Sequence, residues 1–263
     1  MGKARVLILR TAGTNCDYET RYAFDSVGAS TSLEHVNRLI SGKVSLNDFE
    51  ILVIPGGFTY GDDIAAGKIL ANELKYKLRA EIEQFARDGK LAIGICNGFQ
   101  VLVKAGLLPA FDGKVEQSVT LVFNDSNKFE DRWVYLKTND ESRCIYTEGI
   151  EPIVYMPVAH AEGKFVSKDS ETLSKLEESG QVVFTYVDEH GEPTGYPGNP
   201  NGSVKGIAGI CDPTGRIFGM LPHPERHMHP TQHPRWAREG LKEEGDGMAI
   251  FKNAVDFVAR NLI

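Results

Sequence analysis

The chain of 263 residues has only four cysteines, and no two of them stand in a CxxC pair. Cys16, Cys96, Cys144 and Cys211 are widely separated. Zinc ribbons and thioredoxin-like redox sites need closely spaced pairs, so the sequence disfavours both classes. A long chain with a few unpaired cysteines normally keeps them reduced in the cytoplasm. Each cysteine is therefore expected either to pack in the core or to act as a nucleophile.

Long hydrophobic runs are also missing. No run approaches the ~20 apolar residues of a membrane-spanning helix. The first residues, MGKARVLILRTAG, lack the long apolar stretch and the small-residue cleavage site of a secretion signal. We therefore expect a cytoplasmic protein without a membrane partner.

The sequence contains no basic block. Its 29 Lys and Arg against 36 Asp and Glu give a formal net charge of −7, which weighs against nucleic acid as the partner. The 41% of hydrophobic residues suffice for a sizeable core. Because we find no repeats and no linker, we expect a single domain over residues 1–263. The turn-rich residues 188–203 are predicted to form a long loop within it.

The first half of the chain alternates short apolar runs with amphipathic stretches. Continuous apolar runs are typical of strands covered on both faces, so this half predicts a parallel α/β sheet. The expected strands are 4–10, 31–36, 50–55 and 91–96, and the expected helices are 17–28 and 69–88.

The second half contains shorter, closely spaced strands with turns between them, which indicates antiparallel or mixed pairing. Residues 215–221 return to the buried type, and helices are expected near 169–179 and over 247–261. The predicted fold is α/β: three layers (α/β/α) around a mostly parallel central sheet, with a smaller mixed or antiparallel sheet.

Cys96 stands between two glycines at the end of an apolar strand, in Gly94-Ile95-Cys96-Asn97-Gly98. Small residues two before and two after a reactive side chain allow the sharp strand-to-helix turn of a nucleophile elbow. The start of a helix favours the thiolate form of a cysteine. The motif alone leaves open whether Cys96 is a nucleophile or a buried residue in a tight turn.

The other three cysteines lack this setting. Cys144 and Cys211 have neither flanking glycines nor a following helix, and they are expected to pack in the core. Cys16 precedes a predicted helix but has no glycine beside it.

A base for the thiol is offered by His223, which directly follows the strand 215–221. At the carboxyl end of a parallel strand it would share the edge of the sheet at which Cys96 lies. Glu225 stands two residues later and could orient the imidazole. Cys96, His223 and Glu225 are thus the predicted catalytic residues.

Gly56 and Gly57 directly follow the strand 50–55. Backbone without side chains can lie close to a ligand and present its N–H groups. Gly57 could therefore supply half of an oxyanion hole, and the N–H of Asn97 the other half. The nearby GDDIAAGKI (61–69) does not fit a phosphate loop, because five residues separate its glycines and Ile69 replaces Ser or Thr. We predict no nucleotide site.

Four histidines within eleven residues suggest a metal site at first sight. Prolines at 224, 230 and 234 break the helix that would place these side chains on one face, so we predict no metal. The histidines are His223, His227, His229 and His233.

Three motifs, in this order, resemble those of a known family: PGGF after the third strand, GxCxGxQ at the elbow and HPE near the end. The chain resembles the class I (triad-type) glutamine amidotransferases, and among them the glutaminase subunits of phosphoribosylformylglycinamidine synthase. The segments that carry the resemblance cover nearly the whole chain: GTNCDYE (13–19), IPGGFTYGDDIAAG (54–67), GICNGFQVLVKAGLLP (94–109), NDSNKFEDRWV (124–134), HAEGKF (160–165) and LPHPERH (221–227).

The resemblance implies a flavodoxin-like fold and a mechanism through a thioester. The Cys96 thiolate would attack the carboxamide of glutamine, His223 would pass a proton to the departing ammonia, and Glu225 would orient His223. Gln100, one helical turn after Cys96, would hold the amino-acid end of the substrate. Asn124 and Phe129 are looser candidates for substrate binding.

The resemblance also implies partners. Ammonia would pass to a separate ATP-dependent synthetase in purine synthesis, together with a small bridging subunit. ATP and magnesium are expected in that synthetase, and no cofactor is expected in this chain. Residues 188–203 and 229–245 look longer than in typical stand-alone glutaminase subunits, which leaves the mode of docking open.

Three other interpretations remain at this stage. The chain could be the glutaminase of another amidotransferase, such as one for pyridoxal phosphate, histidine or guanine nucleotide. It could be a stand-alone cysteine hydrolase on the same fold, which would need no partner for full activity. It could also be a binding module with an inactive triad.

Overall fold

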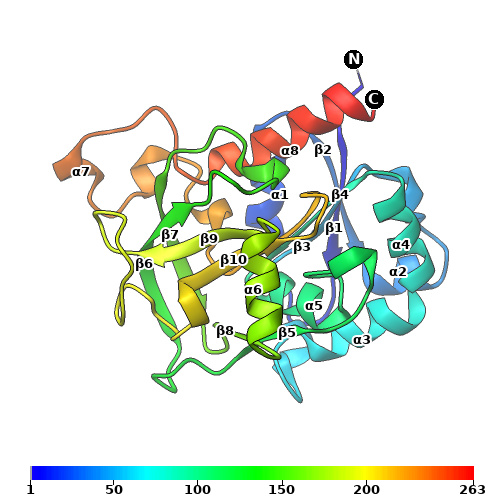
Figure 1. Cartoon of the computed structure of the whole chain (residues 1–263). Coiled ribbons are helices and arrows are strands. Elements are labelled where there is room, and N and C mark those ends of the chain that lie inside the picture. The colour runs from blue at the N-terminus through cyan, green and yellow to red at the C-terminus, as the bar shows by residue number, and fades with distance from the viewer. Residues whose placement is uncertain (1) are drawn as a thin grey trace.

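A nine-stranded sheet runs through the molecule, with strand order β2-β1-β3-β4-β11-β10-β9-β6-β7 (Figure 1). The structure is a computed structural model that describes residues 2–263. The strands are β1 (Arg5–Arg10), β2 (Ser30–His35), β3 (Ile51–Ile54), β4 (Leu91–Ile95), β5 (Val119–Val122), β6 (Glu130–Thr138), β7 (Ile153–His160), β8 (Lys164–Ser167), β9 (Val182–Val187), β10 (Ile207–Cys211) and β11 (Ile217–Met220). The α-helices are α1 (Asp17–Ser26), α2 (Val36–Ile40), α3 (Lys68–Lys77), α4 (Arg79–Arg87), α5 (Asn97–Ala105), α6 (Ser170–Glu178), α7 (Trp236–Glu239) and α8 (Met248–Asn261).

Five neighbouring strands, β2, β1, β3, β4 and β11, are parallel. Every residue of β3, β4 and β11 is buried, as their continuous apolar sequences predict. The order of the first four strands, β2-β1-β3-β4, is the order found in flavodoxin-like folds. In such folds ligands bind outside the carboxyl ends of the strands.

The remaining strands of the large sheet, β10, β9, β6 and β7, are joined antiparallel. Only β5 and β8 form a separate two-stranded antiparallel sheet. The predicted α/β class, parallel core and small antiparallel sheet are confirmed. Most strands of the second half nevertheless extend the central sheet. The sequence does not reveal this arrangement, because pairings such as β11 with β4 and β9 with β6 join strands that are far apart in the chain.

Helices cover both faces of the sheet (Figure 1). Successive residues of β1 point to opposite faces: Val6 and Ile8 pack in one core with α1 and α8, whereas Leu7 and Leu9 pack in the other with α2 to α5. The predicted helix 247–261 corresponds to α8.

The predicted helix 69–88 is wrong in one respect, because it consists of two helices. Leu78 has φ −124°, outside the helical region, and separates α3 from α4. Leu74, Leu78 and Ile82 are all buried, so the apolar spacing continues through the break and conceals it in the sequence.

The outer edge of β7 is covered by the segment 223–246. The N–H of His223 donates to the carbonyl of Pro157 at 2.8 Å, and the N–H of Tyr155 donates to Asp246 at 2.8 Å. The Nδ1 of His227 lies 2.7 Å from the carbonyl of Tyr155. The segment that contains the predicted base is therefore anchored by hydrogen bonds to the backbone of β7.

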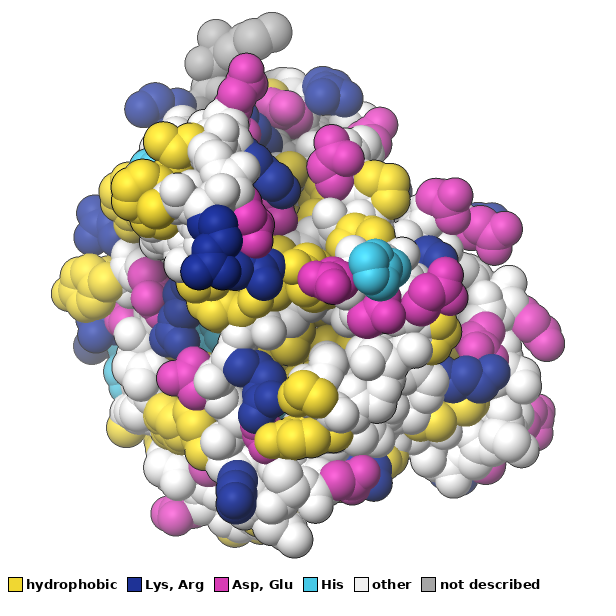
Figure 2. Space-filling view, turned by 90° about the vertical axis from the view of Figure 1, so that its left-hand side faces the viewer, with side chains coloured by type: hydrophobic (Ala, Val, Ile, Leu, Met, Phe, Trp, Pro, Cys, Tyr) yellow, Lys and Arg dark blue, Asp and Glu magenta, His cyan; other side chains and the backbone are white. Residues whose placement is uncertain are grey.

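In the part of the chain that the structure describes, no helix combines the length and apolarity needed to cross a bilayer. Figure 2 shows the face that lies to the left in Figure 1, where basic, acidic and hydrophobic side chains are interspersed. Charge of one sign does not dominate this face.

Candidate active site

Cys96 lies at a sharp turn between β4 and α5. Its backbone has φ 51° and ψ −104°, a conformation that residues other than glycine rarely adopt. Two tight packing contacts explain the flanking glycines: a Cβ on Gly94 would lie 2.5 Å from the carbonyl oxygen of Gly98, and one on Gly98 would lie 1.8 Å from that of Ile54. The backbone thus has the strand-turn-helix geometry predicted from the two glycines.

The elbow is joined to the strand that carries the histidine. The N–H of Cys96 donates to the carbonyl of Met220 at 2.8 Å, so β4 and β11 end side by side. Three residues after Met220 the chain reaches His223. Parallel pairing of these two strands therefore brings residues 96 and 223 to the same edge of the sheet.

His223 and Glu225 form a buried pair. The Nδ1 of His223 lies 2.6 Å from Oε1 of Glu225, and the two residues are 1% and 3% exposed. A short 3₁₀ turn over Pro224–Arg226 turns the Glu225 carboxylate back towards the imidazole. The Nε2 of His223 makes no hydrogen bond within residues 2–263. One side of the ring is oriented, and the other is available for a proton.

The electrostatic environment favours the charged imidazole. Burial lowers the pKa of His223, but the Glu225 carboxylate and Cys96 more than offset it and hold that pKa well above its usual value. His160, also buried near this site, behaves differently: burial and the neighbouring His223 lower its pKa to about 4. Of these two histidines, only His223 is suited to hold a proton beside a thiolate.

The glycine turn predicted to bind an oxyanion lies beside α1. Gly57 has φ 144°, and a Cβ there would lie 2.8 Å from both the nitrogen of Asn15 and the carbonyl oxygen of Gly13. Within residues 2–263, neither the N–H of Gly57 nor that of Asn97 donates a hydrogen bond. Both backbone groups are therefore free to donate to a ligand.

The side chains of Asn97 and Gln100 are used inside the protein. Asn97 Nδ2 donates to Gln100 Oε1 at 2.8 Å and to Asp62 at 3.0 Å, and its Oδ1 accepts from the N–H of Thr59. Gln100 Nε2 donates to the carbonyl of Glu162 at 2.6 Å. Gln100 holds together the loops beside the elbow, and its role as a substrate contact stays a prediction.

Asn124 and Phe129 lie in different surroundings. Asn124 is 1% exposed, and its amide bonds to the carbonyls of Lys128 and His160, to the ring of His160 and to the N–H of Gly163. Phe129 is 48% exposed and stacks on the half-exposed Phe58, with 6.2 Å between ring centroids. Phe129 is the more accessible of the two residues. That either residue contacts the substrate stays a prediction.

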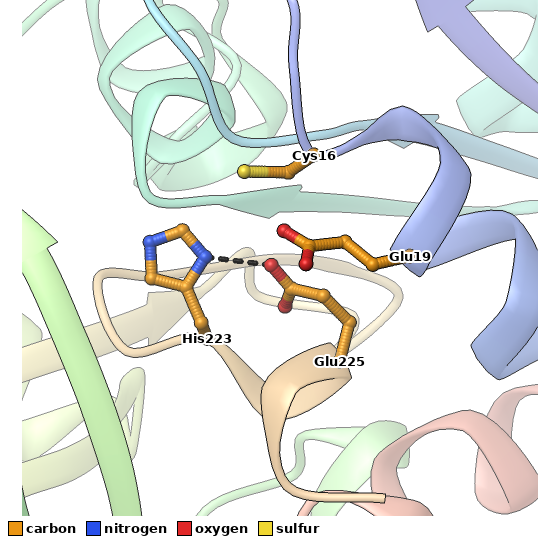
Figure 3. Close-up of side chains that lie close together, drawn as sticks. All are labelled: Cys16, Glu19, His223 and Glu225. Atoms are coloured by element: carbon orange, nitrogen blue, oxygen red, sulfur yellow. Dashed lines mark hydrogen bonds and ion pairs between the residues drawn. The ribbon is translucent and has the colours of Figure 1, made fainter.

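The four clustered histidines do not come together around one point. Only His223 belongs to the group of metal-type donors found in the described residues, which also contains Cys16, Glu19 and Glu225. One donor atom of each lies within 4.8 Å of the others (Figure 3). A positive charge is already there, because Arg226 Nη2 lies 3.2 Å from Cys16 Sγ and 2.9 Å from Glu19 Oε1.

Cys16, Glu19 and Arg226 were not singled out by the sequence. The contact between Arg226 and Cys16 joins residues 210 positions apart in the sequence, so no local pattern reveals it. The one available signal was the position of Cys16 immediately before α1.

Comparison with known proteins identifies the family. Residues 3–258 match the CobB/CobQ-like glutamine amidotransferase domain. The chain belongs to this family. The predicted class I glutamine amidotransferase is thereby confirmed, as is an enzyme of the glutaminase type.

The amidotransferase has curated relatives of nearly the same length. It is 51% identical over 256 residues to phosphoribosylformylglycinamidine synthase subunit PurQ of Dehalococcoides mccartyi, covering 97% of this chain and 98% of the relative. It is 44% identical over 267 residues to the protein of the same name in Methanococcus maripaludis, covering 96% and 97%. The expected extra length of residues 188–203 and 229–245 finds no support in these subunits.

A solved structure shows the same fold. The amidotransferase matches a chain in the structure of PurLQS from Thermotoga maritima with a TM-score of 0.74 and 30% identity, over 98% of this chain and 100% of that chain. The resemblance to glutaminase subunits of phosphoribosylformylglycinamidine synthase is therefore confirmed along the whole length.

Proposed function

We propose that this amidotransferase is the glutaminase subunit of a phosphoribosylformylglycinamidine synthase. The buried His223–Glu225 pair at the edge of the sheet where Cys96 forms its elbow carries the chemistry. The nearly full-length relationship to PurQ subunits carries the assignment to this synthase. We further propose that the chain forms a single domain over residues 1–263 and works in the cytoplasm.

The reaction follows from the site. The Cys96 thiolate attacks the carboxamide carbon of glutamine, and the oxyanion accepts hydrogen bonds from the N–H groups of Gly57 and Asn97. His223, held by Glu225, gives its Nε2 proton to the departing ammonia and leaves a γ-glutamyl thioester. His223 then takes a proton from water, the hydroxide attacks the thioester, and glutamate leaves as the thiolate returns.

The ammonia is proposed to pass to a separate synthetase subunit, accompanied by a small bridging subunit. That synthetase would use ATP and magnesium to convert formylglycinamide ribonucleotide to the amidine. The structure of PurLQS from Thermotoga maritima, one chain of which this amidotransferase resembles, supports an assembly of this kind.

Reconstitution tests the proposal. The chain, a phosphoribosylformylglycinamidine synthetase subunit and the small subunit are mixed with glutamine, ATP and formylglycinamide ribonucleotide, without ammonium salts. We expect equimolar glutamate and amidine, and little glutaminase activity from the chain alone. Glutamate without amidine would point to another amidotransferase, and full activity of the chain alone would point to a stand-alone hydrolase.

A further inference from the structure

Cys16 is a second buried thiol at the active site, and the proposed reaction does not use it. It is 1% exposed and directly precedes α1. Figure 3 shows its side chain directed towards the imidazole of His223 from the residue before α1, whereas His223 and Glu225 come from the segment after β11. Two distant parts of the chain therefore meet at this ring.

The sulfur of Cys16 has a defined set of partners. Its Sγ lies 3.2 Å from Asn15 Oδ1, to which the thiol can donate, and the sulfur accepts from Arg226 Nη2 at 3.2 Å. Burial raises the pKa of Cys16 to about 11. Cys16 thus stays a neutral thiol at physiological pH and does not compete with Cys96 as a nucleophile.

Cys16 also contacts the glycine turn that would bind the oxyanion. Its N–H donates to the carbonyl of Gly56 at 3.2 Å. A Cβ on Gly56 would lie 3.0 Å from Cys16 Sγ and 2.9 Å from His223 Cε1, so these three residues are in close contact. The imidazole of His223 and the sulfur of Cys16 therefore pack against the same glycine.

Arg226 fixes the sulfur from the other side. Its guanidinium pairs with Glu19 of α1 at 2.9 Å, and it belongs to the same 3₁₀ turn as Glu225. The contacts from Glu19 through Arg226 to Cys16 therefore link α1 to the turn that orients His223.

We propose that Cys16 is a positioning residue of the glutaminase site, which holds His223 against Cys96 and supports the Gly56–Gly57 turn. This role rests on the proposed function, because it concerns the same thiolate and base. The thiol is small and neutral, and it can accept from Arg226 while donating to Asn15. Serine keeps both hydrogen-bonding abilities, and alanine keeps neither.

The test compares Cys16→Ala, Cys16→Ser and a control, Cys211→Ala, in the full chain assembled with its synthetase. Cys211 is also 1% exposed but contacts neither His223 nor Cys96 through any hydrogen bond in the structure. We expect Cys16→Ala to lower kcat about 10-fold with little change in KM, and Cys16→Ser to recover most of it. Cys211→Ala should keep wild-type kcat.

A second measurement does not depend on glutamine turnover. The rate at which iodoacetamide alkylates Cys96, identified by mass spectrometry of the peptide, is followed from pH 5 to pH 10. In Cys16→Ala the midpoint of this curve should move to higher pH, because a poorly placed imidazolium stabilises the thiolate less. In Cys211→Ala the midpoint should not move.

Two outcomes overturn the proposal. One is a Cys16→Ala variant with wild-type kcat and an unmoved alkylation midpoint. The other is an equal loss of kcat and thermal stability in all three variants, which would show a general effect of core thiols. A wild-type chain that has no glutaminase activity even when assembled with its synthetase would defeat the proposed function, whereas the alkylation midpoint would still decide the role of Cys16.

Discussion

His223 and Glu225 are joined by a 2.6 Å contact between Nδ1 and Oε1, with almost no exposure to solvent. A carboxylate that is buried this deeply has a stronger effect on its neighbour than one at the surface, because water screens it less. The free Nε2 of the same ring is the atom on which the proposed chemistry depends.

Replacing Cys96 by alanine should abolish glutaminase activity and leave the fold intact. In the proposed mechanism the Cys96 thiolate forms the covalent bond to the substrate, so a loss of at least about 10³-fold is expected. A glutamine-analogue chloroketone should label wild-type Cys96 and fail to label the variant. Labelling of another cysteine in the variant, at the wild-type rate, would show that Cys96 is not the nucleophile.

Glu225→Gln should lower kcat by about 10²-fold or more while KM changes little. The amide keeps the size of the side chain but removes the charge that orients the ring and stabilises the imidazolium. Steady-state kinetics of the assembled enzyme measures this split. The neighbouring Glu19→Gln serves as a comparison with a smaller expected loss, because the Glu19 carboxylate accepts hydrogen bonds from Arg226, whereas that of Glu225 pairs with His223 directly.

The raised pKa of His223 predicts how stability depends on pH. The folded protein binds this proton more tightly than the unfolded chain, whose histidine titrates near ~6.5. The contribution is therefore fully present below about pH 6.5 and is lost as the pH rises through the raised pKa of folded His223. Urea unfolding at several pH values should show Glu225→Gln losing less stability than wild type between pH 6 and pH 9. An equal loss in both proteins would contradict this assignment.

Gly98→Ala should destabilise the protein by at least about 3 kcal/mol, because the added Cβ would lie 1.8 Å from the carbonyl oxygen of Ile54. Gly195→Ala is the matched control, since nothing lies within 4 Å of a Cβ there. Chemical denaturation of both variants measures the difference. Similar stability of the two would mean that the elbow is not tightly packed against β3.

Gln100→Ala should lower the free energy of unfolding by about 1–3 kcal/mol, because its partners on Asn97 and Glu162 are left unsatisfied. Denaturation and KM are measured on the same preparation. A higher KM at unchanged stability would instead support a direct contact between Gln100 and the substrate.

Local patterns predicted those parts of the fold and of the site that are local in the chain. Strands such as Leu91–Ile95 are continuously apolar, and the glycines at 94 and 98 predict the turn at Cys96. Glu225 is two residues from His223, so proximity in sequence was enough to suggest the pair.

Features that depend on distant contacts could not be predicted in this way. The break at Leu78 leaves the apolar spacing unchanged, and it is visible only in the backbone dihedral angles. The pairing of β9 with both β6 and β10 decides that the second half extends the main sheet. Arg226 lies beside Cys16 because the pairing of β11 with β4 brings the end of β11 to the edge of the sheet at which Cys16 lies.

The anchoring of residues 223–246 on β7 has a consequence for the life of the protein in the cell. β7 ends the sheet, and an uncovered end strand offers its backbone to other chains and promotes aggregation. The segment that covers it also carries His223 and Glu225. A molecule in which this segment detaches would lose its proposed catalytic base and expose an unpaired edge strand at the same time. We therefore expect chaperones and proteases to remove the inactive molecules.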